Sequence, residues 1–285
     1  MRRPAQVGAI AKASVYPARS VRGFSLIDIL VSLSVIALLI SILLPTLSAA
    51  QEATRRIACA SNMRQQGLAM QNYAFGHLDS LPTSVFDART RDESPSAEET
   101  IYLRLDATKR VATFGALHAR RNPSTFDSDD RRDGLVWDGL GKLYSEEYVS
   151  HHACFYCPSH HGNHSEQVYR PQFLDLHNQQ LTVGSREIAG NFQLRLGLQK
   201  KRLHDLNSQV SLVSDAVRTQ EDYNHINGNN LFRADLSVTW FADTNGQLWN
   251  TLASGDEKDT RILRSAVGKA WEILDGGNFD PVAPR

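Results

Sequence analysis

Histidine and cysteine side chains are concentrated in residues 151–164, which read HHACFYCPSHHGNH. The donors in this stretch are His151, His152, Cys154, Cys157, His160, His161 and His164. Thiolate sulfur and imidazole nitrogen are ligands that zinc prefers in a tetrahedral site. However, the second Cys or His pair of a zinc finger does not follow at the usual distance. In an oxidising compartment these cysteines would form disulfides instead, so the interpretation depends on where the segment lies.

A second pair of residues able to do chemistry is His225 with Asp235, which have nine residues between them. A histidine and an aspartate can act as a base and its orienting partner, but no motif places a Ser or Cys nucleophile beside them. We therefore predict a structural hydrogen bond for this pair and no catalytic role. Residues 243–246, Asp-Thr-Asn-Gly, contain calcium-type ligands, but one such fragment predicts a turn.

The elements that position these residues in the C-terminal region are predicted strands. Residues 209–216, QVSLVSDA, alternate between apolar and polar side chains, which predicts a strand. Residues 230–234 and 237–241 predict two further strands, joined at Asp235 and Leu236. Leu236 lacks the freedom to adopt positive φ that a glycine gives at a two-residue turn.

Residues 50–76 contain no proline and place apolar or small residues at helical spacing. These residues are Ile57, Ala60, Met63, Gly67, Met70 and Ala74. Such a stripe predicts an amphipathic helix that packs on a domain. Leu81-Pro82 ends this pattern. The charged residues 127–133 predict an exposed loop. A further helix is predicted around residues 143–149.

Residues 29–47 carry no charged side chain and consist of Leu, Ile, Val and Ala with a few Ser or Thr and one Pro. Nineteen residues at about 1.5 Å rise reach about 28 Å, close to the thickness of a bilayer core. A buried core helix is the alternative, but a helix that is apolar on all faces has little to hide inside in a chain this polar elsewhere. We therefore predict one membrane-spanning helix.

The remaining composition is that of a globular protein, with 285 residues, 41% hydrophobic and 22% charged residues and a net charge of zero. Balanced charge gives no support for a nucleic-acid partner. Residues 1–22 carry Arg2, Arg3, Lys12, Arg19 and Arg22 and no acid. This segment has no apolar core of its own, so it is not a conventional signal peptide. Its positive charge predicts a cytoplasmic N-terminus and a translocated C-terminal part.

Asp28 stands at the edge of the apolar run, where an unpaired carboxylate costs a few kcal/mol. Gly23-Phe-Ser-Leu-Ile-Asp28 followed by an apolar helix resembles the processing site of type IV prepilins and type II secretion pseudopilins. The resemblance implies that a prepilin peptidase cuts between Gly23 and Phe24, that Phe24 is methylated, and that Asp28 pairs with the N-terminal ammonium of a neighbouring subunit. The family has Glu where this chain has Asp28. Pro45 matches the family helix, in which a proline permits a kink.

The two outer cysteines also fall on positions that resemble this family. Residues 59–73 are similar to its pattern after the membrane helix, and residues 155–159 to a Cys-Pro phrase that follows a short helix. The resemblance implies a disulfide between Cys59 and Cys157 that ties the long helix to the head. A local bridge from Cys154 to Cys157 and metal binding remain alternatives, because connectivity cannot be deduced from sequence alone.

His225 and Asp235 resemble the H-x9-DG signature found near the C-terminus of a large group of bacterial prepilin-like proteins. Leu236 stands where that signature has glycine. The predicted fold class is α+β, with a basic leader at residues 1–23, a long helix at 24–77 that spans the membrane to about residue 47, and a head at 78–285 with a small antiparallel sheet packed on the helix.

The resemblance implies a pseudopilin-like structural subunit of a type II secretion or type IV pilus-like system, and not an enzyme. We expect no cofactor, no bound metal and no nucleic acid. The expected partners are a prepilin peptidase, other pilin-like subunits and the bacterial inner membrane, with the head on the periplasmic side. The alternative is a single-pass anchored enzyme or metal-binding protein that uses residues 151–164.

Overall fold

The computed structural model describes residues 25–84, 101–106, 135–177, 187–198, 201–257 and 259–276. The predicted leader, with Gly23, and the following Phe24 lie outside these residues, as does the charged loop 127–133. The described chain combines one long N-terminal helix with antiparallel sheets, so the predicted α+β class is confirmed. It divides into two compact units, residues 1–49 and 50–285, which are described in turn.

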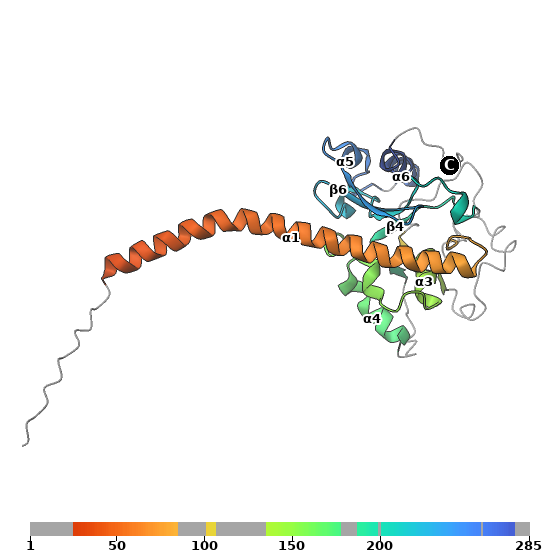
Figure 1. The fold of residues 1–285 in the computed structure, drawn as a ribbon, viewed down its shortest axis with the longest axis horizontal. Helices are drawn as coiled ribbons and strands as arrows, with labels where there is room; N and C mark the ends of the chain where they lie inside the picture. The colour runs from red at the N-terminus through yellow and green to blue at the C-terminus, as the bar shows by residue number, and fades with distance from the viewer. Residues whose placement is uncertain are drawn as a thin grey trace, which may run out of the picture. The chain divides into compact units, whose positions relative to one another are not determined.

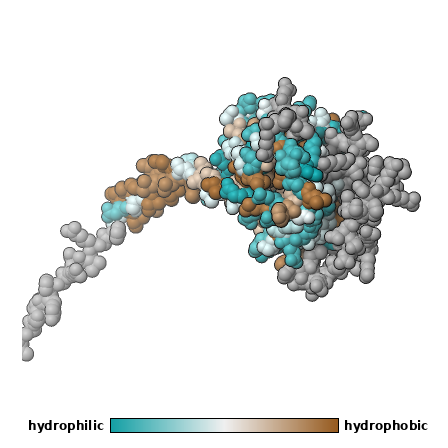
Figure 2. All heavy atoms as spheres, turned by 45° about the vertical axis from the view of Figure 1, so that its right-hand side comes forward, coloured by the Kyte–Doolittle hydropathy of each residue, from teal (hydrophilic) through white to brown (hydrophobic). Residues whose placement is uncertain are grey.

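Helix α1 runs from Leu26 to Gly76 and contains Pro45. In the first unit, its residues are exposed on all sides, and this part of the helix is long and apolar enough to cross a membrane. Figure 2 shows it as a nearly continuous hydrophobic surface. Because exposing an apolar surface of this extent to water is unfavourable, we expect lipid or other protein to cover it.

In the second unit, α1 buries one face in the head. The buried residues are Cys59, Met63, Gln66, Gly67, Ala69, Met70, Tyr73 and Ala74. Four members of the predicted stripe are therefore core, whereas Ile57 is 69% exposed and its assignment to the stripe was wrong. The buried residues of α1 begin two positions later, at Cys59.

The larger sheet of the head has four antiparallel strands in the order β4-β5-β6-β7. These are β4 (Phe192–Leu194), β5 (Ser211–Asp215), β6 (Gly228–Arg233) and β7 (Val238–Ala242). Strand β5 lies within the predicted 209–216, and the β6-β7 hairpin begins near the predicted positions. The predicted turn falls at Leu236, which adopts φ 67°.

Two layers of helix cover this sheet (Figure 1). The second half of α1 packs on one face, where Met63 and Phe232 belong to the same core cluster. The opposite face carries Leu231 under α5 (Gln247–Thr251) and α6 (Thr260–Leu274). Adjacent strand residues point to opposite faces, so Leu231 and Phe232 contribute to separate cores.

A smaller antiparallel sheet has the order β2-β1-β3. Its strands are β1 (Tyr102–Asp106), β2 (Leu135–Trp137) and β3 (Ile188–Ala189). The helices beside it are α3 (Gly141–Ser145) and α4 (Glu166–His177), and three short 3₁₀ helices are η4 (His152–Phe155), η5 (Leu203–Asp205) and η6 (Gln220–Asp222). The sequence predicted one sheet; this second sheet, α4 and α6 were not predicted.

Candidate functional site

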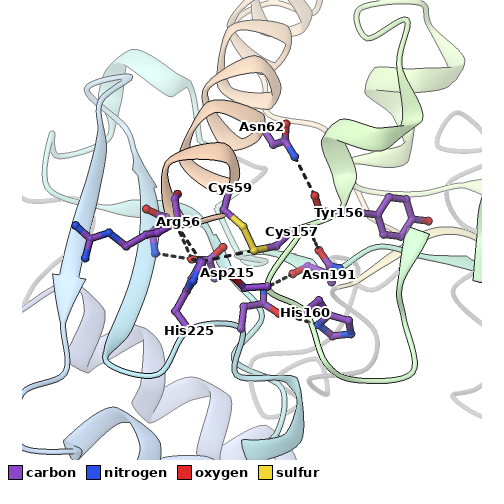
Figure 3. The surroundings of a disulfide bond; sticks show 12 residues. Arg56, Cys59, Asn62, Tyr156, Cys157, His160, Asn191, Asp215 and His225 are labelled. Atoms are coloured by element: carbon purple, nitrogen blue, oxygen red, sulfur yellow. Dashed lines mark hydrogen bonds and ion pairs between the residues drawn. A yellow bond between two sulfur atoms is a disulfide. The ribbon is translucent and has the colours of Figure 1, made fainter. Parts of the chain in front are cut away.

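The described polar core of the head centres on a disulfide between Cys59 of α1 and Cys157, which follows η4 (Figure 3). The two Cα atoms lie 4.9 Å apart and the sulfurs are buried. The backbone N–H of Cys157 donates to the side-chain oxygen of Asn191. This bond joins the pair of cysteines that the family resemblance implied, and it closes a loop across 98 positions of the sequence.

Residues on successive turns of α1 bind the segment 154–159 in reverse order. Glu52 accepts a hydrogen bond from the Ser159 hydroxyl at 3.0 Å, and Cys59 bonds to Cys157. Further along, the Asn62 amide donates to the carbonyl of Tyr156 at 2.9 Å, and the Gln66 amide donates to the carbonyl of Cys154 at 2.7 Å. The segment therefore runs antiparallel to α1, with polar contacts on both sides of the disulfide.

His225 is the imidazole at the centre of this site. It precedes β6 and is only 2% exposed. Its Nδ1 lies 2.6 Å from a carboxylate oxygen of Glu52. Because an ionised carboxylate only accepts hydrogen bonds, Nδ1 carries the proton. The other ring nitrogen, Nε2, lies 3.4 Å from Asp215 Oδ2 and 3.5 Å from Cys157 Sγ.

Asp215, at the end of β5, is fully buried. Burial raises the pKa of its carboxyl, and the nearby His225, the amide groups of Asn230 and the side chain of Asn224 oppose that rise. Asn230 donates to Asp215 Oδ2 from its backbone at 2.6 Å and from its side chain at 3.0 Å. The other oxygen, Oδ1, is buried without a hydrogen-bond partner among the described residues. A buried carboxylate oxygen without a hydrogen bond lowers the stability of the fold unless another group binds it.

An aromatic side chain closes the site beside His225. Trp240 of β7 meets the imidazole edge to face, with ring centroids 5.6 Å apart. The guanidinium carbon of Arg56 lies 4.1 Å from the centroid of a Trp240 ring. The cation and the aromatic ring attract each other.

The histidines of residues 151–164 do not form a group that could hold a metal by themselves, although the backbone N–H of His164 donates to His160 Nε2 at 3.4 Å. His160 Nδ1 lies 2.7 Å from Asn224 Oδ1, and His152 Nε2 lies 3.4 Å from a carboxylate oxygen of Glu166. His164 contacts Arg218, and burial together with that guanidinium lowers its pKa to about 4. Among the described residues, the group with ligand atoms close enough to hold a metal is instead Cys59, Cys157, Asp215 and His225.

Residues 48–182 match a family model described as a protein of unknown function, DUF1559. Such a match is typical of prepilin-like bacterial proteins. The matched range contains Cys59 and Cys157 and ends before His225. Searches of curated proteins and of solved structures found no match. The family match and the apolar N-terminal helix are together consistent with a pilin-like protein with a single membrane anchor.

His225 and Asp235 have different partners in the structure, so the hydrogen bond predicted between them is not formed. Asp235 lies in the β6-β7 turn and accepts from the backbone of Ser237 at 3.0 Å. The six residues of β6 span about 20 Å at 3.3 Å each. The spacing thus places the two residues beyond opposite ends of one strand. At the turn, Leu236 adopts positive φ and packs its partly buried side chain on the core.

Residues 243–246 form the predicted turn. The carboxylate of Asp243 accepts hydrogen bonds from the backbone of Leu248 at 3.0 Å and of Trp249 at 2.9 Å. It therefore satisfies backbone donors in the first turn of α5, as a capping side chain does.

The remaining predicted site residues lie in the first unit. Asp28 is in the first turn of α1, where its carboxylate accepts a hydrogen bond from the Ser25 backbone at 3.1 Å. A carboxylate near a helix N-terminus also interacts favourably with the helix dipole. Pro45 lies within the helix. Gly23 and Phe24 are outside the described residues.

Sequence reasoning missed Glu52 and Asp215 as members of the site. Glu52, Cys59 and Gln66 recur at intervals of seven, which is close to two helical turns and places them on one face. This spacing could have predicted that Glu52 lies on the same side of the helix as Cys59. Asp215 had no comparable signal, because its partners come from separate strands and loops.

Proposed function

We propose that this chain is a pseudopilin-like structural subunit. In this proposal a prepilin peptidase cuts between Gly23 and Phe24, Phe24 is methylated, and the mature subunits assemble into a short filament. The filament would belong to a type II secretion or type IV pilus-like system at the bacterial inner membrane, with the head in the periplasm.

The observation that carries the proposal is that the two parts of α1 have different surroundings. Residues 26–49 expose apolar side chains on every side, whereas Met63, Met70 and Tyr73 of the same helix are core residues of the head. A simple anchor needs only the apolar part. Here the helix is also a structural element of the head, fixed there by the Cys59–Cys157 bond. The match to a family typical of prepilin-like proteins supports the same function.

Asp28 supports assembly rather than simple anchoring. A carboxylate at the edge of the bilayer core costs a few kcal/mol without a partner. We assign to it the N-terminal ammonium of Phe24 in a neighbouring subunit, which would neutralise the charge only when subunits are adjacent. Aspartate is one methylene shorter than the glutamate of the family, so the neighbouring helices would have to lie slightly closer.

We propose a structural rather than a catalytic role for the head. Its central histidine contacts a cysteine sulfur, but that sulfur is bonded to Cys59 and cannot act as a nucleophile. The side chains of His160, His164 and His152 are held by Asn224, Arg218 and Glu166. These contacts give no support to the alternative of an anchored enzyme or metal-binding protein that uses this stretch.

The proposal is tested by expressing the full chain with and without an active prepilin peptidase and measuring the N-terminus by mass spectrometry. We expect a product that begins at methylated Phe24 only when the peptidase is active. Gly23→Leu should block the cut, while Gly23→Ala, which keeps a small residue, is the matched control. A wild-type chain that still begins at Met1 in the presence of the peptidase would overturn the proposal.

A further inference from the structure

We propose that the reduced head binds one zinc ion at the position of the disulfide, through Cys59, Cys157, His225 and Asp215. The oxidised and the metal-bound forms would then be two exclusive states of one site. The site is distinct from residues 151–164, which contribute only Cys157. The inference is independent of the pseudopilin proposal, because it rests on the side chains of the head alone.

The two distances from His225 Nε2 to its neighbouring donors match the edges of a tetrahedral zinc site. Zinc binds nitrogen and oxygen at about 2.0–2.1 Å and sulfur at about 2.3 Å, so the tetrahedral edges are about 3.5 Å for nitrogen to sulfur and about 3.3 Å for nitrogen to oxygen. His225 Nε2 lies 3.5 Å from Cys157 Sγ and 3.4 Å from Asp215 Oδ2. The four ligand atoms all lie within 4.8 Å of one another. The two sulfurs are too close for a metal site, because they are bonded.

Reduction removes that obstacle. An added phosphine gives two electrons to the S–S bond and is oxidised to its phosphine oxide, while water supplies the oxide's oxygen and the two protons of the resulting thiols. Zinc then displaces the two thiol protons, since the thiolate is the form that binds metal. The sulfurs must separate from about 2.0 Å to about 3.8 Å, the sulfur-to-sulfur edge of the tetrahedron. Rotation of the Cys59 and Cys157 side chains can supply this movement.

Asp215 is a buried carboxylate that a bound cation would stabilise. Its Oδ1 is buried without a hydrogen-bond partner among the described residues, and the side chain is fully enclosed. Buried charges are ordinarily paired or coordinate metals. A divalent ion bound here would offset two of the three negative charges that this carboxylate and the two thiolates carry after reduction.

The groups around the four donors are those that support a zinc site. A histidine that binds a metal through one nitrogen usually donates its other N–H to a carboxylate, which fixes the tautomer. In this site His225 Nδ1 lies 2.6 Å from Glu52, and Glu52 in turn accepts a hydrogen bond from Ser159. Asn230 holds Asp215 Oδ2 through two hydrogen bonds. The structure thus contains the outer contacts of a metal site as well as its ligands.

The test uses the full chain in detergent micelles under oxygen-free conditions. The protein is reduced with a phosphine, freed of reductant and titrated with Co²⁺, followed by Zn²⁺. We expect binding of one ion per chain, with the sulfur-to-cobalt charge-transfer band and the intense visible bands of tetrahedral cobalt, and displacement by zinc. The oxidised chain should bind neither. Circular dichroism and tryptophan fluorescence establish that the reduced head is folded.

Substitutions of the proposed ligands test which residues bind the metal. His225→Ala and Asp215→Asn, each first shown to fold in the oxidised form, should weaken zinc binding by at least about 100-fold, and Glu52→Gln by about 10- to 100-fold. Cys154→Ser and His160→Gln are matched controls and should keep wild-type affinity. The proposal is overturned if the reduced chain binds no zinc, whether it stays folded or unfolds beyond rescue by zinc. It is also overturned if the controls, and not His225→Ala, abolish binding.

Discussion

Removal of the Cys59–Cys157 disulfide should cost the head a large part of its stability. The bond spans 98 sequence positions, and in the chain-entropy model a closed loop of about 100 residues is worth about 4.7 kcal/mol. Cys59→Ala with Cys157→Ala also deletes two buried sulfurs, at about 1 kcal/mol each. We therefore expect a total loss of about 6–7 kcal/mol, compared with about 5–15 kcal/mol for a typical domain.

The assay is urea unfolding of the oxidised full chain in a nonionic detergent, followed by tryptophan fluorescence. All four tryptophans, Trp137, Trp240, Trp249 and Trp271, lie in the head, so the signal reports the head and not the membrane-spanning segment. Cys154→Ala is the matched control, because Cys154 is a buried cysteine outside the disulfide. It should cost about 1 kcal/mol.

A double variant that loses less than about 3 kcal/mol would contradict a large contribution from the disulfide, since the control accounts for about 1 kcal/mol per sulfur. Such a result would mean that noncovalent contacts already confine the loop in the unfolded state. A loss well above 7 kcal/mol would point instead to a cost from leaving His225 and Asp215 in a disrupted core.

Three further predictions follow from single contacts. Gly67→Ala should destabilise the head by about 1–3 kcal/mol in the same urea assay, because a Cβ there would lie 2.2 Å from the Phe232 ring; an unchanged midpoint would contradict it. Asp28→Asn should leave cleavage intact but abolish cross-linking between subunits, and Asp28→Glu should preserve both; cross-linking by the Asn variant would argue against charge pairing. The free energy of unfolding of the head should fall from pH 6.5 towards pH 4. In this range the unfolded chain protonates His164, whereas the folded head keeps it neutral because its pKa is lowered to about 4. His164→Gln should flatten that slope in urea titrations at several pH values, and an unchanged slope would place the effect elsewhere.

The long helix and the central strands could be predicted because their signals are local. An apolar run and a three-to-four-residue stripe specify the helix, which ends at Gly76. Alternation in residues 209–216 specifies β5. Helix α6 had a usable local signal as well: Asp259 caps its first turn, and its apolar residues Leu263, Val267, Ala270 and Trp271 recur on one face.

The polar site could not be predicted in full, because its contacts are distant in sequence. His225 and Glu52 are 173 positions apart, and no periodicity links them. The nine-residue spacing suggested Asp235 as the partner of His225, but spacing along an extended strand separates residues instead of pairing them. Only the family resemblance indicated that Cys59 and Cys157 belong together, and it did not extend to Asp215.

The polar contacts of α1 explain why this helix is held by more than a hydrophobic stripe. An apolar interface alone tolerates a slip of one helical turn, about 5.4 Å, because Met63, Met70 and similar side chains can repack. The same slip would break the disulfide and leave the amide of Gln66 and the carboxylate of Glu52 without their present partners. For the buried Gln66, the loss of its partner costs about 1–3 kcal/mol. The polar series therefore fixes the register of α1 against residues 154–159, so a force or displacement applied to the helix would act on the whole head.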